Sequence, residues 1–127
     1  MKNLFVTVVL TAFSLITLHA QSVENLPNIL GTWEVDLRPS PDSEPFIQYL
    51  VITEISGTSL KGTFYESSLE DGLVNEKFDS VFLAFTTNDQ SSTYYHFIKL
   101  IDGNRIEGLT YSRNRNLIQP WKGRRIE

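Results

Sequence analysis

Few side chains in this chain could do covalent or metal chemistry. The sequence contains no cysteine, and His96 is the only histidine outside the first 20 residues. A zinc site or a cysteine–histidine nucleophile therefore lacks its ligands or its reacting group. His96 lies in the middle of TYYHFIK (93–99), and no serine has the sequence context of a nucleophile elbow. We expect no catalytic residue, and we interpret His96 as a hydrogen-bonded or surface histidine of a strand.

The acidic residues do not have the spacing of a metal site either. Glu70 and Asp71 form a short charged run, and DGLVNE (71–76) lacks the ligand spacing of a calcium loop. A phosphate-binding loop and an N-glycosylation motif are also absent from the sequence. The sequence thus predicts no metal, no cofactor and no enzymatic activity, which leaves binding as the expected role.

Residues 1–20 have the layout of a secretory signal peptide. Lys2 precedes an apolar middle part, and the small residue Ala20 ends the segment. The apolar run is short for a bilayer span, and no basic stop-transfer cluster follows it. We expect a signal-peptide helix at 1–20, a single domain at 21–127, and a secreted or periplasmic protein with no stable membrane anchor. A retained anchor is the alternative.

The charge balance bears on the expected partners. The chain has 11 Lys and Arg against 15 Asp and Glu, and removal of the leader with Lys2 leaves 10 against 15, a net charge of −5. A negative chain is repelled by nucleic acid and by anionic membranes, so neither is an expected partner.

Segments typical of β-strands fill the rest of the chain. TWEVDLR (32–38) alternates apolar and charged residues, the period-two pattern of a half-buried strand, and a proline-rich loop follows it. The acidic, glycine-containing stretch before residue 77 is predicted to be a loop. Further strands are predicted at 46–55, 60–67, 77–87, 93–101 and 105–112, with a last short one in 121–127.

Six or seven strands in a short chain leave exposed strand edges, and closure into a barrel is the usual remedy. We predict an all-β fold, a small antiparallel up-and-down meander barrel of about seven to eight strands, with an open or flattened sheet as the alternative. Most strands carry apolar residues on both faces, as Phe82 does against Val81 and Leu83. Outward apolar residues favour a homo-oligomer or a docked protein partner.

Gly31-Thr32-Trp33, which opens the first strand, resembles the G-x-W signature of the calycins, the group of lipocalin, fatty-acid-binding and avidin barrels. In those families the tryptophan closes one end of the barrel, and a basic side chain from the last strand lies across its ring. The resemblance implies that Gly31 and Trp33 close the barrel, with either Arg124 or Arg125 over the indole.

Within the calycins, SGTSLKGTFYES (56–67) is similar to the first hairpin of avidins, and this likeness covers about residues 31–67. Three positions depart from the avidin pattern. Val35 replaces an asparagine that binds a urea oxygen, Pro39 replaces a serine, and Phe64 stands at a tyrosine position. Because burial of biotin's polar ring without these partners costs several kcal/mol, biotin is not the expected ligand.

Two binding hypotheses follow. In the first, the barrel holds a small apolar or aromatic ligand, and interior aromatic residues line the pocket: Tyr49, Phe64, Tyr95 and Tyr111. In the second, the protein is a protein-binding module, such as a secreted protease inhibitor or an assembly subunit, that uses its outer strand faces. A barrel interior with roughly 300 Å³ of free space favours the first, and a solid core with an exposed patch favours the second.

Overall fold

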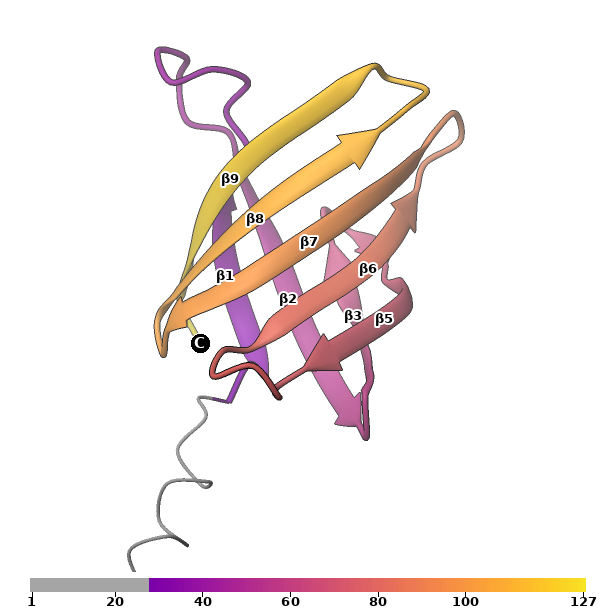
Figure 1. The fold of residues 1–127 in the computed structure, drawn as a ribbon. Coiled ribbons are helices and arrows are strands. Elements are labelled where there is room, and N and C mark those ends of the chain that lie inside the picture. The colour runs from indigo at the N-terminus through magenta and orange to yellow at the C-terminus, as the bar shows by residue number, and fades with distance from the viewer. Residues whose placement is uncertain (1–27) are drawn as a thin grey trace, which may run out of the picture.

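The structure, a computed structural model, describes residues 28–127. The expected signal peptide lies outside these residues. The described chain is all-β, as predicted, and folds into strands connected mostly by short turns (Figure 1). The strands are β1 (Gly31–Asp36), β2 (Ile47–Ser56), β3 (Ser59–Phe64), β4 (Ser67–Ser68), β5 (Glu70–Asn75), β6 (Phe82–Asn88), β7 (Thr93–Asp102), β8 (Arg105–Ser112) and β9 (Leu117–Arg125).

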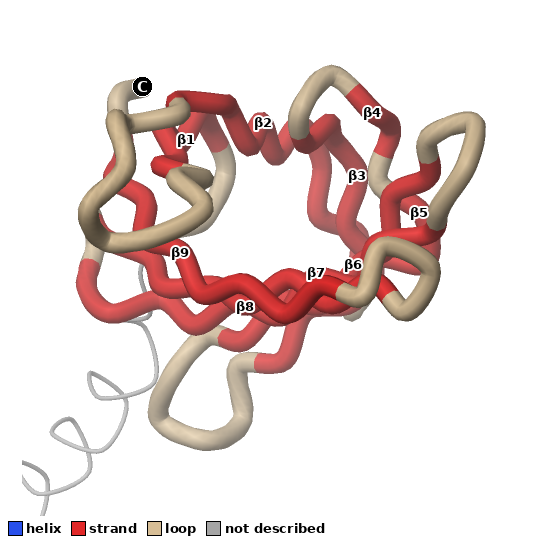
Figure 2. The backbone as a smooth tube through the Cα atoms, turned by 90° about the horizontal axis from the view of Figure 1, so that it is seen from above, coloured by secondary structure: helices blue, strands red, loops and turns tan. Residues whose placement is uncertain are grey.

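The strands form one closed antiparallel barrel. The sheet order is β2-β1-β9-β8-β7-β6-β5-β3-β4, and an additional pairing of β2 with β3 closes the ring. Eight strands therefore surround the interior, and the two-residue β4 is an extra strand beside β3. The view along the barrel in Figure 2 shows this ring. The predicted meander barrel is confirmed, and the open sheet is excluded for the described residues.

Alternate residues of the strands fill the barrel, as a period of two requires. Most of the core is aliphatic, and four large aromatic side chains lie within it: Trp33, Phe64, Phe85 and Trp121. Trp121 lies directly against Gly108, its partner on the neighbouring strand. A Cβ atom at Gly108 would lie 2.2 Å from the Trp121 ring, so only glycine leaves room for the indole.

Three segments differ from the prediction. The acidic stretch expected to be a loop contains β5, which pairs with β6 across a register shift between Glu70 and Leu73. The strand expected at 77–87 begins only at Phe82. The last strand is longer than expected, because β9 begins at Leu117 and continues through Pro120. β9 pairs with β8 and with β1, so it completes the ring.

Candidate functional site

One end of the barrel is closed by Trp33. Its side chain is 0% exposed, and its Nε1–H donates to the carbonyl of Ile29 at 3.1 Å. The guanidinium of Arg125 lies over the indole, with Cζ 4.3 Å from the ring centroid. At this distance a cation–π interaction stabilises the contact by about 0.5–2 kcal/mol. Trp33 and Arg125 together form a plug at this end.

Arg125 also ties the plug to the surrounding chain. Its Nε donates to the carbonyl of Gly103 at 3.0 Å, and its Nη1 donates to that of Leu30 at 2.6 Å. Its Nη2 donates to the carbonyl of Asn28. One side chain thus connects the β7–β8 turn, the segment before β1 and the last strand.

Gly31 permits the close approach of the carboxyl terminus. Its φ is +125°, and a Cβ atom at this position would lie 2.2 Å from the backbone oxygen of Glu127. That oxygen accepts a hydrogen bond from the N–H of Thr32 at 3.1 Å. A residue with a side chain would be strained and would push the terminus away.

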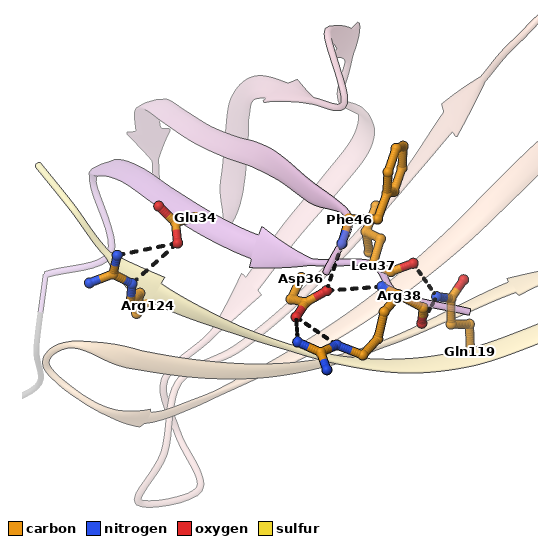
Figure 3. A network of polar contacts seen from close by, with 7 residues as sticks. All are labelled: Glu34, Asp36, Leu37, Arg38, Phe46, Gln119 and Arg124. Atoms are coloured by element: carbon orange, nitrogen blue, oxygen red, sulfur yellow. Dashed lines mark hydrogen bonds and ion pairs between the residues drawn. The ribbon is translucent and has the colours of Figure 1, made fainter. Parts of the chain in front are cut away.

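Arg124 faces away from the plug. Its Nε and Nη2 both lie 3.3 Å from Oε1 of Glu34 on the outer face of the barrel (Figure 3). Of the two arginines that the sequence left open, the structure places Arg125 over the Trp33 ring and Arg124 in an exposed ion pair.

This difference in position gives a matched pair of variants. Arg125→Ala is expected to lower the free energy of unfolding by about 2–3 kcal/mol, because the indole loses its cation and three backbone carbonyls lose their donor. Arg124→Ala removes only an exposed ion pair and is expected to cost less than about 1 kcal/mol. Urea denaturation followed by circular dichroism measures both losses. Equal losses would contradict the assigned role of Arg125.

The opposite end of the barrel contains a cavity of about 470 Å³. The cavity lies where β1, β3 and β6 end and where β2, β7 and β9 begin. The β7–β8 turn at Gly103, to which Arg125 of the plug is bonded, therefore lies at the other end of the barrel. The apolar lining of the cavity consists of Leu37, Phe46, Phe64, Tyr65 and Leu117. The remaining lining residues are polar or charged, and they are distributed between the floor and the mouth.

Aromatic rings form the floor of the cavity. The ring of Phe64 is 2% exposed and lies edge-on to His96, with the centroids 4.8 Å apart. Phe64 also contacts Phe85 and Trp121, at centroid distances of 5.9 and 5.4 Å. Phe64, a predicted ligand-binding residue, therefore does line the cavity.

A chain of hydrogen bonds lies beneath the cavity. His96 Nε2 is 2.8 Å from Thr87 Oγ1, and His96 Nδ1 is 2.9 Å from Thr110 Oγ1. Thr110 Oγ1 also accepts the indole N–H of Trp121 at 2.8 Å. Thr110 has a single hydroxyl proton, which can donate a hydrogen bond to Nδ1. The neutral imidazole then carries its own proton on Nε2 and donates a hydrogen bond to Thr87. All of these groups then have partners while His96 is neutral.

Burial lowers the pKa of His96 to about 4. The side chain is 4% exposed, and its two hydrogen-bond partners are uncharged hydroxyls that give an imidazolium no counter-charge. The imidazole is therefore neutral near pH 7. His96 is the hydrogen-bonded strand histidine that the sequence allowed, and it is also a lining residue of the cavity.

Charged groups stand at the mouth of the cavity. Hydrogen bonds from the Ser91 N–H and the Tyr94 hydroxyl, the latter at 2.9 Å, lower the pKa of Asp89 to about 2. Burial and the adjacent Asp89 carboxylate raise the pKa of Tyr94. Arg115 from the β8–β9 turn also lines the mouth. Since Asp89 already accepts bonds from its own loop, it is held as part of the rim.

A polar clamp holds the proline-rich loop against the mouth (Figure 3). Asp36 accepts hydrogen bonds from the backbone N–H groups of Arg38 and Phe46, at 3.0 and 3.1 Å. The Arg38 guanidinium lies against the same carboxylate and lowers the pKa of Asp36. Gln119 donates to the carbonyls of Leu37 and Arg38, at 2.8 and 2.9 Å. These bonds fix Phe46 at the rim, 5.8 Å from the ring of Tyr65.

The three tyrosines predicted to line the pocket lie on the outer face instead. Tyr49, Tyr95 and Tyr111 are 46%, 43% and 41% exposed. Their chain neighbours point inward, so that Leu50 and His96 occupy the interior. These strands have apolar or aromatic residues on both faces, and the sequence pattern assigned the wrong face to the interior.

The inward face of β7 carried a signal that could have found the site. His96, Ile98 and Leu100 share one face of the strand, so a polar residue continues an aliphatic row. On β8, Thr110 is likewise a polar residue on the same inward face as the aliphatic Ile106. Buried polar residues at matching positions of neighbouring strands indicate a hydrogen-bonded group in the core.

Among residues 28–127, the side chains of His, Asp and Glu form no group of three that could hold a metal ion. The same part of the chain contains no helix long and apolar enough to cross a bilayer. No protein-family model matches the chain, and neither a curated protein nor a solved structure matches it. The calycin resemblance therefore stays a prediction.

Proposed function

We propose that the protein is an exported, non-enzymatic binding protein whose barrel holds a small apolar or aromatic ligand at its open end. The observation that carries this proposal is the cavity of about 470 Å³, which falls within the range of small-molecule sites. The signal-peptide pattern of residues 1–20 supports export to the periplasm or beyond.

The lining of the cavity supports an apolar or aromatic ligand body. Phe64 forms the floor, Leu37 and Leu117 form parts of the wall, and Phe46 and Tyr65 stand at the rim. A few polar groups can orient such a ligand. When Thr87 accepts the hydrogen bond from His96 Nε2–H, its own hydroxyl proton is available for a ligand acceptor. The Oε1 of Gln119 can accept a hydrogen bond, because the amide nitrogen of this side chain already bonds the backbone.

The plug supports a calycin-like barrel. The positions of Trp33, Gly31 and Arg125 match what that resemblance implies for the closed end. Val35, which replaces the ligand-binding asparagine of the avidin pattern, is buried in the core. The proposal therefore concerns a calycin-like barrel with a ligand other than biotin.

The close approach of Thr87 to His96 resembles a nucleophile paired with its base, yet the surroundings favour binding over catalysis. A catalytic imidazole is usually oriented by a carboxylate, whereas His96 contacts the hydroxyl of Thr110. A base with a pKa of about 4 is also too weak to take the proton of a hydroxyl efficiently near neutral pH.

A cavity-filling variant tests the proposal. Leu117 lines the cavity, and Leu117→Trp is expected to weaken binding of the neutral probe N-phenyl-1-naphthylamine at least ~30-fold, because the indole takes up the ligand's space. The control is Ile118→Trp, since Ile118 is the next residue and points outward with 68% exposure. Isothermal titration calorimetry measures both affinities.

Native mass spectrometry of the chain purified from its own source provides the second readout. A retained small molecule, lost in Leu117→Trp and kept in Ile118→Trp, is the expected result. A chain that carries no ligand and binds no apolar probe, or equal affinities in both variants, would contradict the proposal.

A further inference from the structure

The wall formed by strands β5 to β9 carries large apolar side chains on its outer surface. We call this surface the outer apolar face, and it consists of Leu73, Phe82, Tyr95, Phe97, Leu109 and Tyr111. Leu73 and Phe97 are 57% and 54% exposed. This wall is turned toward the viewer in Figure 1, and no other part of residues 28–127 lies in front of it.

The outer apolar face is continuous across the strands. Leu73 pairs with Ala84, Ala84 with Phe97, and Phe97 with Leu109, so one row of residues crosses four strands. A second row runs beside it, in which Tyr95 pairs with Tyr111 at a ring distance of 6.0 Å. The small side chain of Ala84 leaves a shallow groove between its larger neighbours.

The area of this face approaches what a stable dimer needs. At about 200 Å² for each large side chain, the exposed fractions of these six residues and of the adjoining Ile118 correspond to about 700 Å² of surface. The largest apolar patch of a typical monomer covers about 300–600 Å². A standard interface buries about 800 Å² on each partner, which the polar rim of this face can complete.

The charges on the face are complementary to a second copy of the same face. Lys99 and Glu107 are cross-strand neighbours that line the groove, and neither forms an ion pair within residues 28–127. The groove is lined by one positive and one negative side chain, and Lys122 on β9 follows Glu107 in the same cross-strand row, so the charges alternate in sign and can match those of a second copy after a two-fold rotation. Lys99 of each copy can then meet Glu107 of the other, whereas a partner of a single charge sign would be opposed by one of the two.

We propose that the outer apolar face is the interface of a two-fold symmetric homodimer. The two walls pack face to face, with their apolar rows at the centre and Lys99 and Glu107 of the two copies paired across the axis. This proposal does not depend on a ligand in the cavity, because the residues concerned point away from the barrel interior.

The test is the mass of the purified chain in solution, measured by sedimentation equilibrium from 1 to 200 μM. We expect a dimer with a dissociation constant in the micromolar range. Phe97→Lys should raise this constant at least ~100-fold, because it places a charge at the centre of the interface. Tyr49→Lys is the matched control, since Tyr49 is an exposed aromatic residue on the opposite wall, and it should leave the dimer intact. Circular dichroism confirms that both variants fold.

A charge exchange makes the test specific for a second copy. Lys99→Glu and Glu107→Lys should each weaken the dimer about tenfold, and the double variant should restore it, because the exchanged pair is again complementary. A chain that stays monomeric at 200 μM, including one that binds lipid vesicles or another protein through this face, would overturn the proposal. A dimer that is insensitive to Phe97→Lys would do the same.

Discussion

Trp33→Ala is expected to lower the free energy of unfolding by about 3–5 kcal/mol, the range measured when large buried aromatic residues are truncated. The side chain is 0% exposed, so its removal leaves a cavity at the closed end of the barrel. The carbonyl of Ile29 loses its indole donor, and the Arg125 guanidinium loses the ring beneath it. Small domains are stable by about 5–15 kcal/mol, so this single variant should remove a large fraction of the total stability.

Urea denaturation measures the loss, with Trp121 as the remaining fluorescent reporter in the core. The control is Trp33→Phe, which keeps an aromatic ring beneath Arg125 and should lose less than half as much. A loss below about 1 kcal/mol for Trp33→Ala would show that the indole does not close the barrel.

The second large effect is a dependence of stability on pH in the range where histidine titrates. The unfolded chain takes up a proton on His96 near its ordinary pKa of 6.5, whereas the folded chain does so only near 4. Between these values the unfolded state binds more protons, so stability rises with pH. The contribution is fully present above about pH 6.5 and is lost as the pH falls toward 4. It amounts to about 3 kcal/mol.

Urea midpoints measured in steps from pH 4 to 7.5 give this profile. His96→Gln is the control, because glutamine cannot be protonated and its amide can still bond a hydroxyl. Its stability should be nearly constant between pH 5 and 7, since the carboxylates with lowered pKa values, such as Asp89, titrate below this window. Parallel profiles for the two proteins would mean that His96 is not buried as a neutral imidazole.

The sequence predicted the architecture well, because the period-two pattern of apolar residues is a local signal. It did not predict β5, since EDGLVN has only one side chain, Val74, fully buried in the core and is bent by the positive φ of Asp71. The start of β9 was not predicted because this part of the strand contains a proline. Proline usually argues against a paired strand, but at Pro120 β9 pairs with β8 alone, because β1 pairs with β9 only from Lys122 onward.

The site was predicted less well than the fold. The closed end follows from a short motif, Gly31 to Trp33, whereas the open end depends on which face of each strand turns inward. Tyr95 and His96 are adjacent, and both could have been the interior residue. Only the closed ring decides between them, because a shift of one residue moves a whole strand face from outside to inside.

The chain leaves the barrel at the end opposite its opening. Glu127 is bonded to Thr32 beside the plug, and Asn28 is held there by Arg125. A tether attached after Glu127 therefore starts on the far side of the molecule from the rim (Figure 1). Immobilised on a sensor surface through that tether, every molecule would present its entrance to the sample.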